Sequence, residues 1–253
     1  MTKVNIYGID GAVQEKVDLP AVFYTPYRPD IIKKSFNTMS SNKRQPYGSD
    51  PFAGAKHSVK SVGKGKGSSR VPRLTQGSAA ALAPCVVGGR RAHPPKVTKD
   101  WKEKINKKER LFALHSALAA TADKTLVSAR GHKFDDKLTL PIVVDDSFAD
   151  MKKTKEVIEA FQKIGVYDDV MRSINGKHIR AGKGKCRGRR YRTPKSVLIV
   201  STKQEIIKSS RNLTGVDIVT PNMVNINYLA PGGIAGRLTI FTTSALKTLG
   251  GAK

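Results

Sequence analysis

Two runs of lysine and arginine without any acidic residue carry the most specific chemistry in this sequence. Residues 51–99 hold ten Lys or Arg, seven Gly and five Pro, and residues 177–195 hold nine more Lys or Arg, with no Asp or Glu in either run. Lys and Arg side chains bind phosphate oxygens, and glycines let a backbone approach phosphates without a side-chain clash. These two runs therefore predict contacts with a polyanion.

The net charge of +26 is concentrated in these two basic runs. The other 185 residues carry 27 basic and 20 acidic residues, which is close to the balance of an ordinary globular protein. A charge run is often only a solvated surface, but two acid-free blocks favour nucleic-acid binding. Membrane binding is disfavoured because the chain has no run of about 18 apolar residues and neither block has an apolar helical face. The start, MTKVNIYG, lacks the pattern of a secretory signal, so we expect a cytoplasmic protein.

The aromatic residues indicate which kind of nucleic-acid contact to expect. Proteins that read single strands stack bases on exposed aromatic rings. Each basic run contains one aromatic residue, Phe52 in the first and Tyr191 in the second. We therefore expect contacts with the phosphates and grooves of folded RNA rather than base stacking. The histidines that lie in these runs, and that can donate hydrogen bonds to RNA, are His57, His93 and His178.

Candidate groups for catalysis or cofactor binding are weak by comparison. The glycine–lysine repeats at 63–67 and 182–188 fit neither GxGxxG nor GxxxxGK[ST], and neither joins a predicted strand to a predicted helix. Asp145 and Asp146 follow a predicted strand, as catalytic carboxylates of α/β enzymes often do, but no His or Lys partner stands at a suitable spacing. We expect these two carboxylates to lie in a solvated loop.

The cysteines and histidines do not form a metal motif either. The two cysteines, Cys85 and Cys186, are far apart in the sequence, and no CxxC or HExxH spacing occurs. We expect reduced thiols, no disulfide and no protein-bound metal. No cofactor is predicted, and magnesium is expected only in association with RNA.

The rest of the chain alternates short apolar strands with single helices. Strands are predicted at residues 4–7, 13–17, 140–144, 197–200, 216–219 and 238–241. Helices are predicted at residues 31–38, from 106 to about 122, over 157–164, around 206–207, shortly after 222 and over 244–249. Capping-box spacing at Asn106 and Glu109, and at Ser201 and Gln204, marks two of the helix starts. This alternation predicts a mostly parallel, doubly wound α/β sheet with helices on both faces, and an antiparallel hairpin at one edge.

These patterns divide the chain into three parts. Residues 1–50 form the N-terminal part of a globular body, with the hairpin and a short helix. Residues 51–99 form a long, extended internal basic loop that penetrates RNA. Residues 100–253 form the main α/β body, with residues 177–195 as a basic insertion. A structureless loop of this length normally counts against an assignment, but here RNA rather than a protein core would order it.

Several short motifs, taken together and in this order, resemble a known protein family. They are Tyr27-Arg-Pro-Asp30, Arg44-Gln-Pro-Tyr-Gly48, Arg70-Val-Pro-Arg73, Ala92-His-Pro-Pro-Lys96, Ser116-Ala-Leu-Ala-Ala-Thr121, Arg130-Gly-His132, Arg180-Ala-Gly-Lys-Gly-Lys185 with Arg187, and Leu229-Ala-Pro-Gly-Gly233 with Gly236-Arg237. The chain resembles large-subunit ribosomal protein four of the archaeal and eukaryotic type along nearly its whole length. Eukaryotic members usually carry a long basic C-terminal extension, whereas this sequence stops at Lys253, so the resemblance is greatest to archaeal members.

The resemblance implies a non-enzymatic structural constituent of the large ribosomal subunit with a Rossmann-like body, located in the cytoplasm. It implies that the loop passes through rRNA and helps to line the nascent-peptide exit tunnel, with its tip near residues 70–78. The implied partners are large-subunit rRNA, neighbouring large-subunit proteins including a second protein with a tunnel loop, and the nascent peptide. No membrane and no homo-oligomer are expected.

The candidate rRNA-binding residues of the loop are Lys43, Arg44, Lys56, Lys60, Lys64, Lys66, Arg90, Arg91, His93 and Lys96. Those of the body are Lys177, Arg180, Lys183, Lys185, Arg187, Arg189, Arg190, Arg192 and Lys195. The candidate tunnel-lining residues are Arg70, Val71, Arg73, Leu74 and Gln76.

Two other functions stay open on the residues alone. One is an α/β RNA-modifying enzyme that uses the carboxyl edge of the sheet, which would need a cofactor loop that the sequence lacks. The other is an architectural protein that compacts DNA, which would bind duplex DNA and rRNA with equal affinity.

Overall fold

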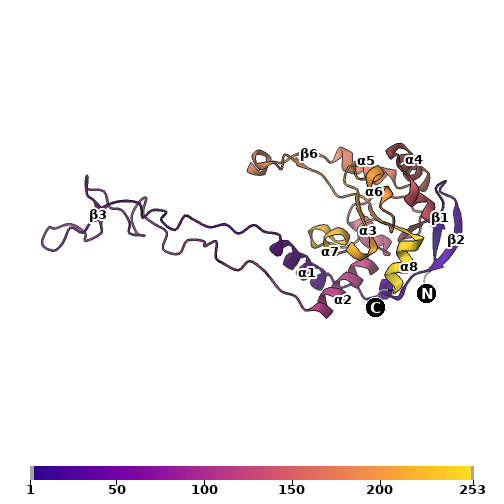
Figure 1. Cartoon of the computed structure of the whole chain (residues 1–253), viewed down its shortest axis with the longest axis horizontal. Coiled ribbons are helices and arrows are strands. Elements are labelled where there is room, and N and C mark those ends of the chain that lie inside the picture. Colours follow the sequence, from indigo (N-terminus) through magenta and orange to yellow (C-terminus); the bar gives the residue numbers. More distant parts are fainter. Residues whose placement is uncertain (1–2, 252–253) are drawn as a thin grey trace. The chain divides into compact units, whose positions relative to one another are not determined.

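The computed structural model describes residues 3–251, and the chain divides into two compact units. Unit 1 is Met1–Ser40 together with Lys104–Lys253, and unit 2 is Ser41–Glu103. Unit 2 is thus an insertion within the sequence of unit 1 (Figure 1).

A mostly parallel six-stranded sheet forms the centre of unit 1, in the order β2-β1-β5-β10-β8-β9. The strands are β1 (Lys3–Tyr7), β2 (Val13–Asp18), β5 (Ile142–Val144), β8 (Leu198–Val200), β9 (Asp217–Val219) and β10 (Thr239–Thr242). All neighbouring strands are parallel except β1 and β2, which form an antiparallel hairpin at one edge. The predicted mixed α/β class, the mostly parallel sheet and the edge hairpin are confirmed.

Helices precede or follow most of the strands. The α-helices are α1 (Pro29–Asn42), α2 (Lys107–Ala119), α3 (Lys124–Ala129), α4 (Thr154–Ile164), α5 (Tyr167–Asn175), α6 (Glu205–Ser210), α7 (Ile226–Leu229) and α8 (Thr243–Gly251). Short 3-10 helices are η1 (Ala21–Tyr24), η2 (Asp146–Asp150), η4 (Pro221–Met223) and η5 (Pro231–Gly233). Among the described residues, no helix is long and apolar enough to cross a membrane.

Two apolar cores cover the two faces of the sheet. In β5, Val143 belongs to one core, whereas its neighbours Ile142 and Val144 belong to the other. Successive side chains of a strand point to opposite faces, so the strands are apolar and buried throughout. Helices α1, α2, α7 and α8 contribute to the first core, and α3, α4, α5 and α6 to the second.

Helix α4 shows how the sequence fixes one of these layers. Val157, Ala160, Phe161 and Ile164 recur at helical spacing and are buried in the second core. The helix ends at Gly165, whose left-handed backbone (φ 84°) disfavours a side chain. A Cβ there would also lie 2.1 Å from the carboxylate of Asp135, so the sequence predicts this helix end well.

The two predicted capping boxes are wrong in detail. Asn106 occupies the N-cap position of α2, but its side chain caps no backbone N–H, and Glu109 instead binds the Lys34 ammonium at 2.7 Å. Ser201 does not cap α6. Its hydroxyl accepts from the backbone N–H of Lys203, and the helix begins only after an intervening turn.

Other differences from the predicted elements have local causes. The apolar run 140–144 forms a strand only from Ile142, because Pro141 has no N–H to donate to a ladder. Helices α3 and α5 were not predicted. The buried face of α5 contains Asp169 and Ser173 as well as Val170, so apolar periodicity gives little signal there.

Candidate nucleic-acid interface

The predicted RNA-binding residues of the body lie together on one hairpin, which we call the basic arm (residues 177–195). It consists of β6 (His178–Ile179) paired antiparallel with β7 (Tyr191–Arg192), and η3 (Lys183–Arg187) lies between the two strands. Eight of the nine predicted cations are exposed and Arg180 is half-buried. The sequence did not predict that these residues form a hairpin.

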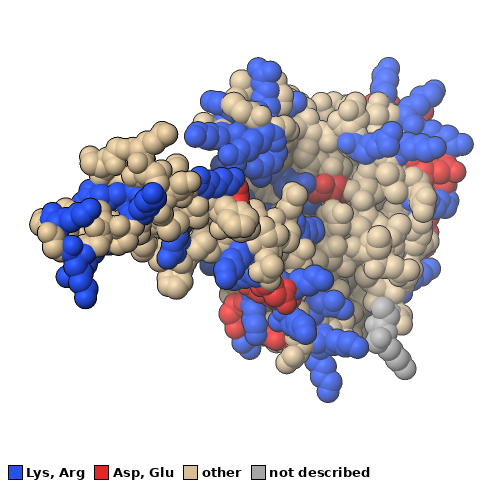
Figure 2. All heavy atoms as spheres, turned by 60° about the vertical axis from the view of Figure 1, so that its left-hand side comes forward, with Lys and Arg blue, Asp and Glu red and all other residues tan. Residues whose placement is uncertain are grey.

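The positive charge of the basic arm has almost no acidic compensation. Among the described residues, Lys195 is the one cation of this group that pairs with a carboxylate, that of Asp217 at 2.9 Å. On the face drawn in Figure 2, Lys and Arg greatly outnumber Asp and Glu, which form only small clusters. An uncompensated cluster of cations attracts a polyanion and is stabilised by it.

Hydrogen bonds bring cationic side chains of the two strands close together. The Arg180 backbone N–H donates to the Arg190 carbonyl at 2.8 Å, and the Arg180 guanidinium donates to the Arg189 carbonyl at 3.1 Å. Tyr191 carries two cations near its ring, Lys177 at 4.9 Å and Arg190 at 5.7 Å. The aromatic residue of the arm is therefore already covered in part by cations.

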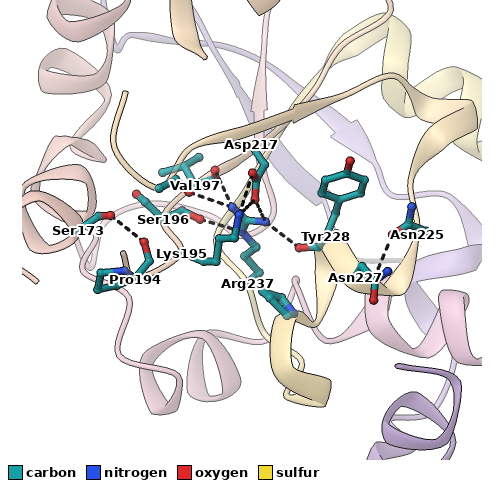
Figure 3. A network of polar contacts seen from close by, with 12 residues as sticks. Ser173, Pro194, Lys195, Ser196, Val197, Asp217, Asn225, Asn227, Tyr228 and Arg237 are labelled. Atoms are coloured by element: carbon teal, nitrogen blue, oxygen red, sulfur yellow. Dashed lines mark hydrogen bonds and ion pairs between the residues drawn. The ribbon is translucent and has the colours of Figure 1, made fainter. Parts of the chain in front are cut away.

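The base of the basic arm is anchored to unit 1. The Ser173 hydroxyl donates to the Pro194 carbonyl of its return strand at 2.7 Å (Figure 3). Arg172 donates to the Lys195 carbonyl at 2.7 Å. Gly215 lies against the same segment, and a Cβ there would come within 2.5 Å of the Pro194 carbonyl oxygen. Hydrogen bonds and close packing thus hold the return strand of the arm against the rest of unit 1.

A fully buried arginine, Arg237, supports this attachment (Figure 3). Its guanidinium pairs with Asp217 at 2.7 Å, and the same carboxylate binds Lys195 of the arm. The guanidinium also donates to the backbone carbonyls of Ser196 (2.8 Å), Tyr228 (2.9 Å), Gly215 (3.1 Å) and Val197 (3.3 Å). Burial opposes ionisation of Asp217, but Arg237 and Lys195 together lower the pKa of that carboxyl.

A second buried polar cluster lies beside the first. The Asp169 carboxylate accepts from His132 Nδ1 (3.0 Å), the Ser196 hydroxyl (2.8 Å) and Arg172 Nε (2.9 Å). Burial opposes ionisation of Asp169, yet these hydrogen bonds lower its pKa to about 2. Burial lowers the pKa of His132 and outweighs the opposing effect of Asp169. His132 is therefore a neutral donor in a structural network at neutral pH.

This network predicts that acid destabilises unit 1. The folded-state pKa of His132 lies below the unfolded value of about 6.5. The contribution of neutral His132 to the free energy of unfolding is therefore fully present above about pH 6.5 and is lost as the pH falls below that value. One such histidine gives a slope of at most about 1.4 kcal/mol per pH unit. We expect His132→Asn, which keeps a donor near Asp169, to flatten the dependence of the unfolding free energy on pH between about 6.5 and 5.

Urea unfolding of both proteins at several pH values measures this difference. Burial also lowers the pKa of His115. Because His115 is present in both proteins, its effect cancels in the difference between wild type and His132→Asn. Equal slopes for wild type and variant would contradict the assigned role of His132.

The predicted loop residues lie in unit 2, and all ten are exposed. Among the described cations of this group, only Lys56 pairs with a carboxylate, that of Asp50 at 2.7 Å. Unit 2 contains a two-stranded sheet of β3 (Val59–Lys60) and β4 (Arg73–Leu74), and Ala81 is its only buried residue within the described part of the chain. Such a small sheet without a core is marginally stable by itself.

The candidate tunnel-lining residues are in two kinds of environment. Arg70 and Gln76 are exposed, whereas Val71, Arg73 and Leu74 are half-buried. Arg73 donates to the Ser78 carbonyl at 2.6 Å, which closes a turn after β4. Arg73 therefore supports the local backbone, whereas the Arg70 side chain is more exposed to solvent.

The carboxylates that follow β5 are helix caps, so the expectation of a solvated loop is wrong. Asp145 accepts from the Ser147 hydroxyl at 2.6 Å at the start of η2, and Asp146 accepts from the Ser244 backbone N–H at 3.0 Å at the start of α8. Within the described residues there is no group of three or more His, Cys, Asp or Glu side chains that could hold a metal ion. Cys85 and Cys186 are both free and exposed.

Comparisons with known proteins agree with each other. A family model described as the ribosomal protein L4/L1 family matches residues 17–252. The large ribosomal subunit protein uL4 of Methanocaldococcus jannaschii is 52% identical over 248 residues, which cover 98% of this chain and 98% of that protein. The protein of the same name from Thermoplasma acidophilum is 49% identical over 248 residues, covering 98% and 97%. That from Methanosphaera stadtmanae is 47% identical over 251 residues, covering 99% and 97%.

Proposed function

Since this chain belongs to the ribosomal protein L4/L1 family, we propose that its two basic segments bind the RNA of the large ribosomal subunit. As an archaeal-type uL4 it is a structural, non-enzymatic component of that subunit, and its location is the cytoplasm. An RNA-modifying activity is therefore not proposed. The implied neighbours, other large-subunit proteins and a second protein with a tunnel loop, are part of the proposal.

The observation that carries the proposal is the basic arm. Eight of its nine Lys and Arg side chains have no carboxylate partner among the described residues, and hydrogen bonds hold the base of the arm to the rest of unit 1. Phosphates would supply the missing counter-charges, and any magnesium would come with the RNA rather than from a protein site. The test is competition between rRNA and duplex DNA at matched salt. Tighter binding of rRNA supports the proposal, and equal affinity would favour an architectural protein that compacts DNA.

We further propose that residues 51–99 act as an extended loop that folds with the RNA. A segment with one buried residue gains little from apolar burial and must offset the entropy lost on ordering. We expect amide hydrogens of residues 54–97 to exchange rapidly in the free protein and slowly in the rRNA complex. Hydrogen exchange with peptide mapping measures both states, and the strands of unit 1 serve as the protected reference. Protection across this segment in the free protein would contradict folding on assembly.

The middle of the loop, near residues 70–78, is proposed to line the peptide exit tunnel beside the nascent chain. Arg70→Glu should change elongation or the response to drugs that bind the tunnel, because it reverses a charge on an exposed side chain. The unfolding free energy should change by no more than about 0.5 kcal/mol. Translation assays with subunits carrying the variant, and urea unfolding of the free protein, separate the two effects. Complete failure of the variant to enter subunits would make this segment a docking element instead.

A further inference from the structure

Two aromatic residues that flank the basic loop in the sequence are stacked in unit 2. The rings of Tyr47 and Trp101 have centroids 6.0 Å apart and planes inclined by 16°. Such offset, nearly parallel rings form a continuous π surface. Each member of the pair lies a few residues outside the run 51–99, so the aromatic content of that run gives no sign of it.

Two cations lie against the Trp101 ring of the pair. The Arg44 guanidinium lies 4.3 Å from the Trp101 ring centroid and the Lys99 ammonium lies 4.9 Å from it. Among the acids nearest in sequence, Asp50 pairs with Lys56 and Asp100 accepts from the Lys102 backbone N–H at 2.9 Å, whereas the exposed Glu103 has no ion pair among the described residues. The cations in contact with the aromatic surface are those at Trp101.

Hydrogen bonds hold the two chain segments that carry the rings. The Asn42 side chain accepts from the Glu103 backbone N–H at 3.0 Å and donates to the Glu103 carbonyl at 3.2 Å. The Ser41 hydroxyl donates to the Trp101 carbonyl at 2.8 Å. These contacts lie outside residues 54–97, so they hold the Trp101 segment against residues 41–42 before the rest of the loop is ordered by a ligand.

Much of the Tyr47 side chain remains open to solvent. The residue is 64% exposed although one side of its ring is stacked, whereas Trp101 is half-buried. A large aromatic residue exposed on a preformed stack leaves a flat apolar surface uncovered.

We propose that Tyr47 is a stacking platform for a single unpaired RNA base, which extends the Tyr47–Trp101 stack by one ring. A nucleotide matches the site in both of its parts. Its planar base fits an open aromatic ring, and its phosphates fit Arg44 and Lys99, the two cations that lie against the Trp101 ring of the same stack. An apolar protein segment would use the ring but would leave these exposed cations without partners. This inference rests on the proposed rRNA binding and adds a defined subsite to it.

Photo-crosslinking with full-length protein and a large-subunit rRNA transcript containing 5-iodouridine tests the contact directly. Iodouridine reacts with aromatic side chains that stack on it, so peptide mapping should locate a crosslink at Tyr47. Trp101, the only tryptophan of the chain, gives a second readout because its fluorescence reports on this site alone. We expect its emission to change on rRNA binding in wild type and in Tyr47→Phe.

Matched variants separate stacking from support of the fold. Tyr47→Leu removes the ring and should weaken rRNA binding about tenfold, within the range for loss of one stacked base, whereas Tyr47→Phe should bind as wild type does. Asn42→Ala removes both hydrogen bonds to Glu103 but leaves the rings, so it reports the cost of loosening the two segments.

The outcomes separate this inference from the proposed function. Strong rRNA binding with no crosslink at Tyr47 and no loss in Tyr47→Leu overturns the stacking site and leaves rRNA binding intact. An equal loss in Asn42→Ala and Tyr47→Leu makes the ring pair a structural clasp and also overturns it. Absence of any salt-dependent rRNA binding by wild type defeats the proposed function itself.

Discussion

Replacing Arg187, Arg189 and Arg190 together by Gln should make the plot of log rRNA affinity against log salt less steep, with the magnitude of its negative slope reduced by about 2 to 3. Each of these exposed side chains lacks a carboxylate partner among the described residues, so each is free to displace a counterion from a phosphate. A slope difference of about 2 corresponds to about 100-fold in affinity between 1 M and 0.1 M salt. Binding measured at four or five salt concentrations gives the slope.

A matched control removes the same formal charge elsewhere on unit 1. Lys34, Lys163 and Lys203 are bound to Glu109, Asp10 and Asp150 at 2.7, 2.9 and 2.6 Å. Their triple Gln variant should leave the slope nearly unchanged, because these cations are already neutralised by carboxylates. The same decrease in both triple variants would show that net charge, not the basic arm, governs binding.

Arg237→Gln should destabilise the free protein by about 3–5 kcal/mol, because it breaks a buried ion pair and leaves buried backbone carbonyls without donors. The Arg237 side chain is fully buried, and the substitution removes one of the two cationic partners of Asp217 and the donors to several backbone carbonyls. Urea unfolding followed by circular dichroism measures the loss. The base of the basic arm should loosen as well, because Lys195 and Ser196 both adjoin the lost contacts.

Arg28→Gln is the control of the same residue type. Its guanidinium pairs with Asp30 at 2.7 Å on an exposed surface, where an ion pair contributes little. No measurable change is expected for this variant. A loss no larger for Arg237→Gln than for Arg28→Gln would mean that the buried network relaxes or admits water without cost.

The fold was predictable where apolar periodicity is strong. The strands around Val143 and Ile199 and the helix containing Phe161 are placed correctly, because burial on both faces leaves a clear pattern in the sequence. Helix α5 was missed because buried Asp169 and Ser173 interrupt that pattern. Their polar groups are satisfied by partners distant in the sequence, which a local pattern cannot reveal.

The candidate interface was predictable as composition but not as geometry. The acid-free run 177–195 identifies the cations, yet the hairpin and its anchorage depend on Arg237, which lies more than forty residues later. The same holds for the loop, where Tyr47 and Trp101 become neighbours only through pairing of distant backbone segments. Sequence runs show charge, but contacts between distant residues require the folded chain.

The paired ends of unit 2 have a consequence for how this protein can change over evolutionary time. Because Asn42 and Glu103 are hydrogen-bonded neighbours, the intervening residues form a closed loop rather than two loose strands. Doubling the length of a flexible closed loop costs only about 0.6 kcal/mol of entropy. Insertions and deletions in the loop between Asn42 and Glu103 should thus change the folding free energy of the rest of the chain very little. The reach of the loop can vary between lineages while the sheet stays the same.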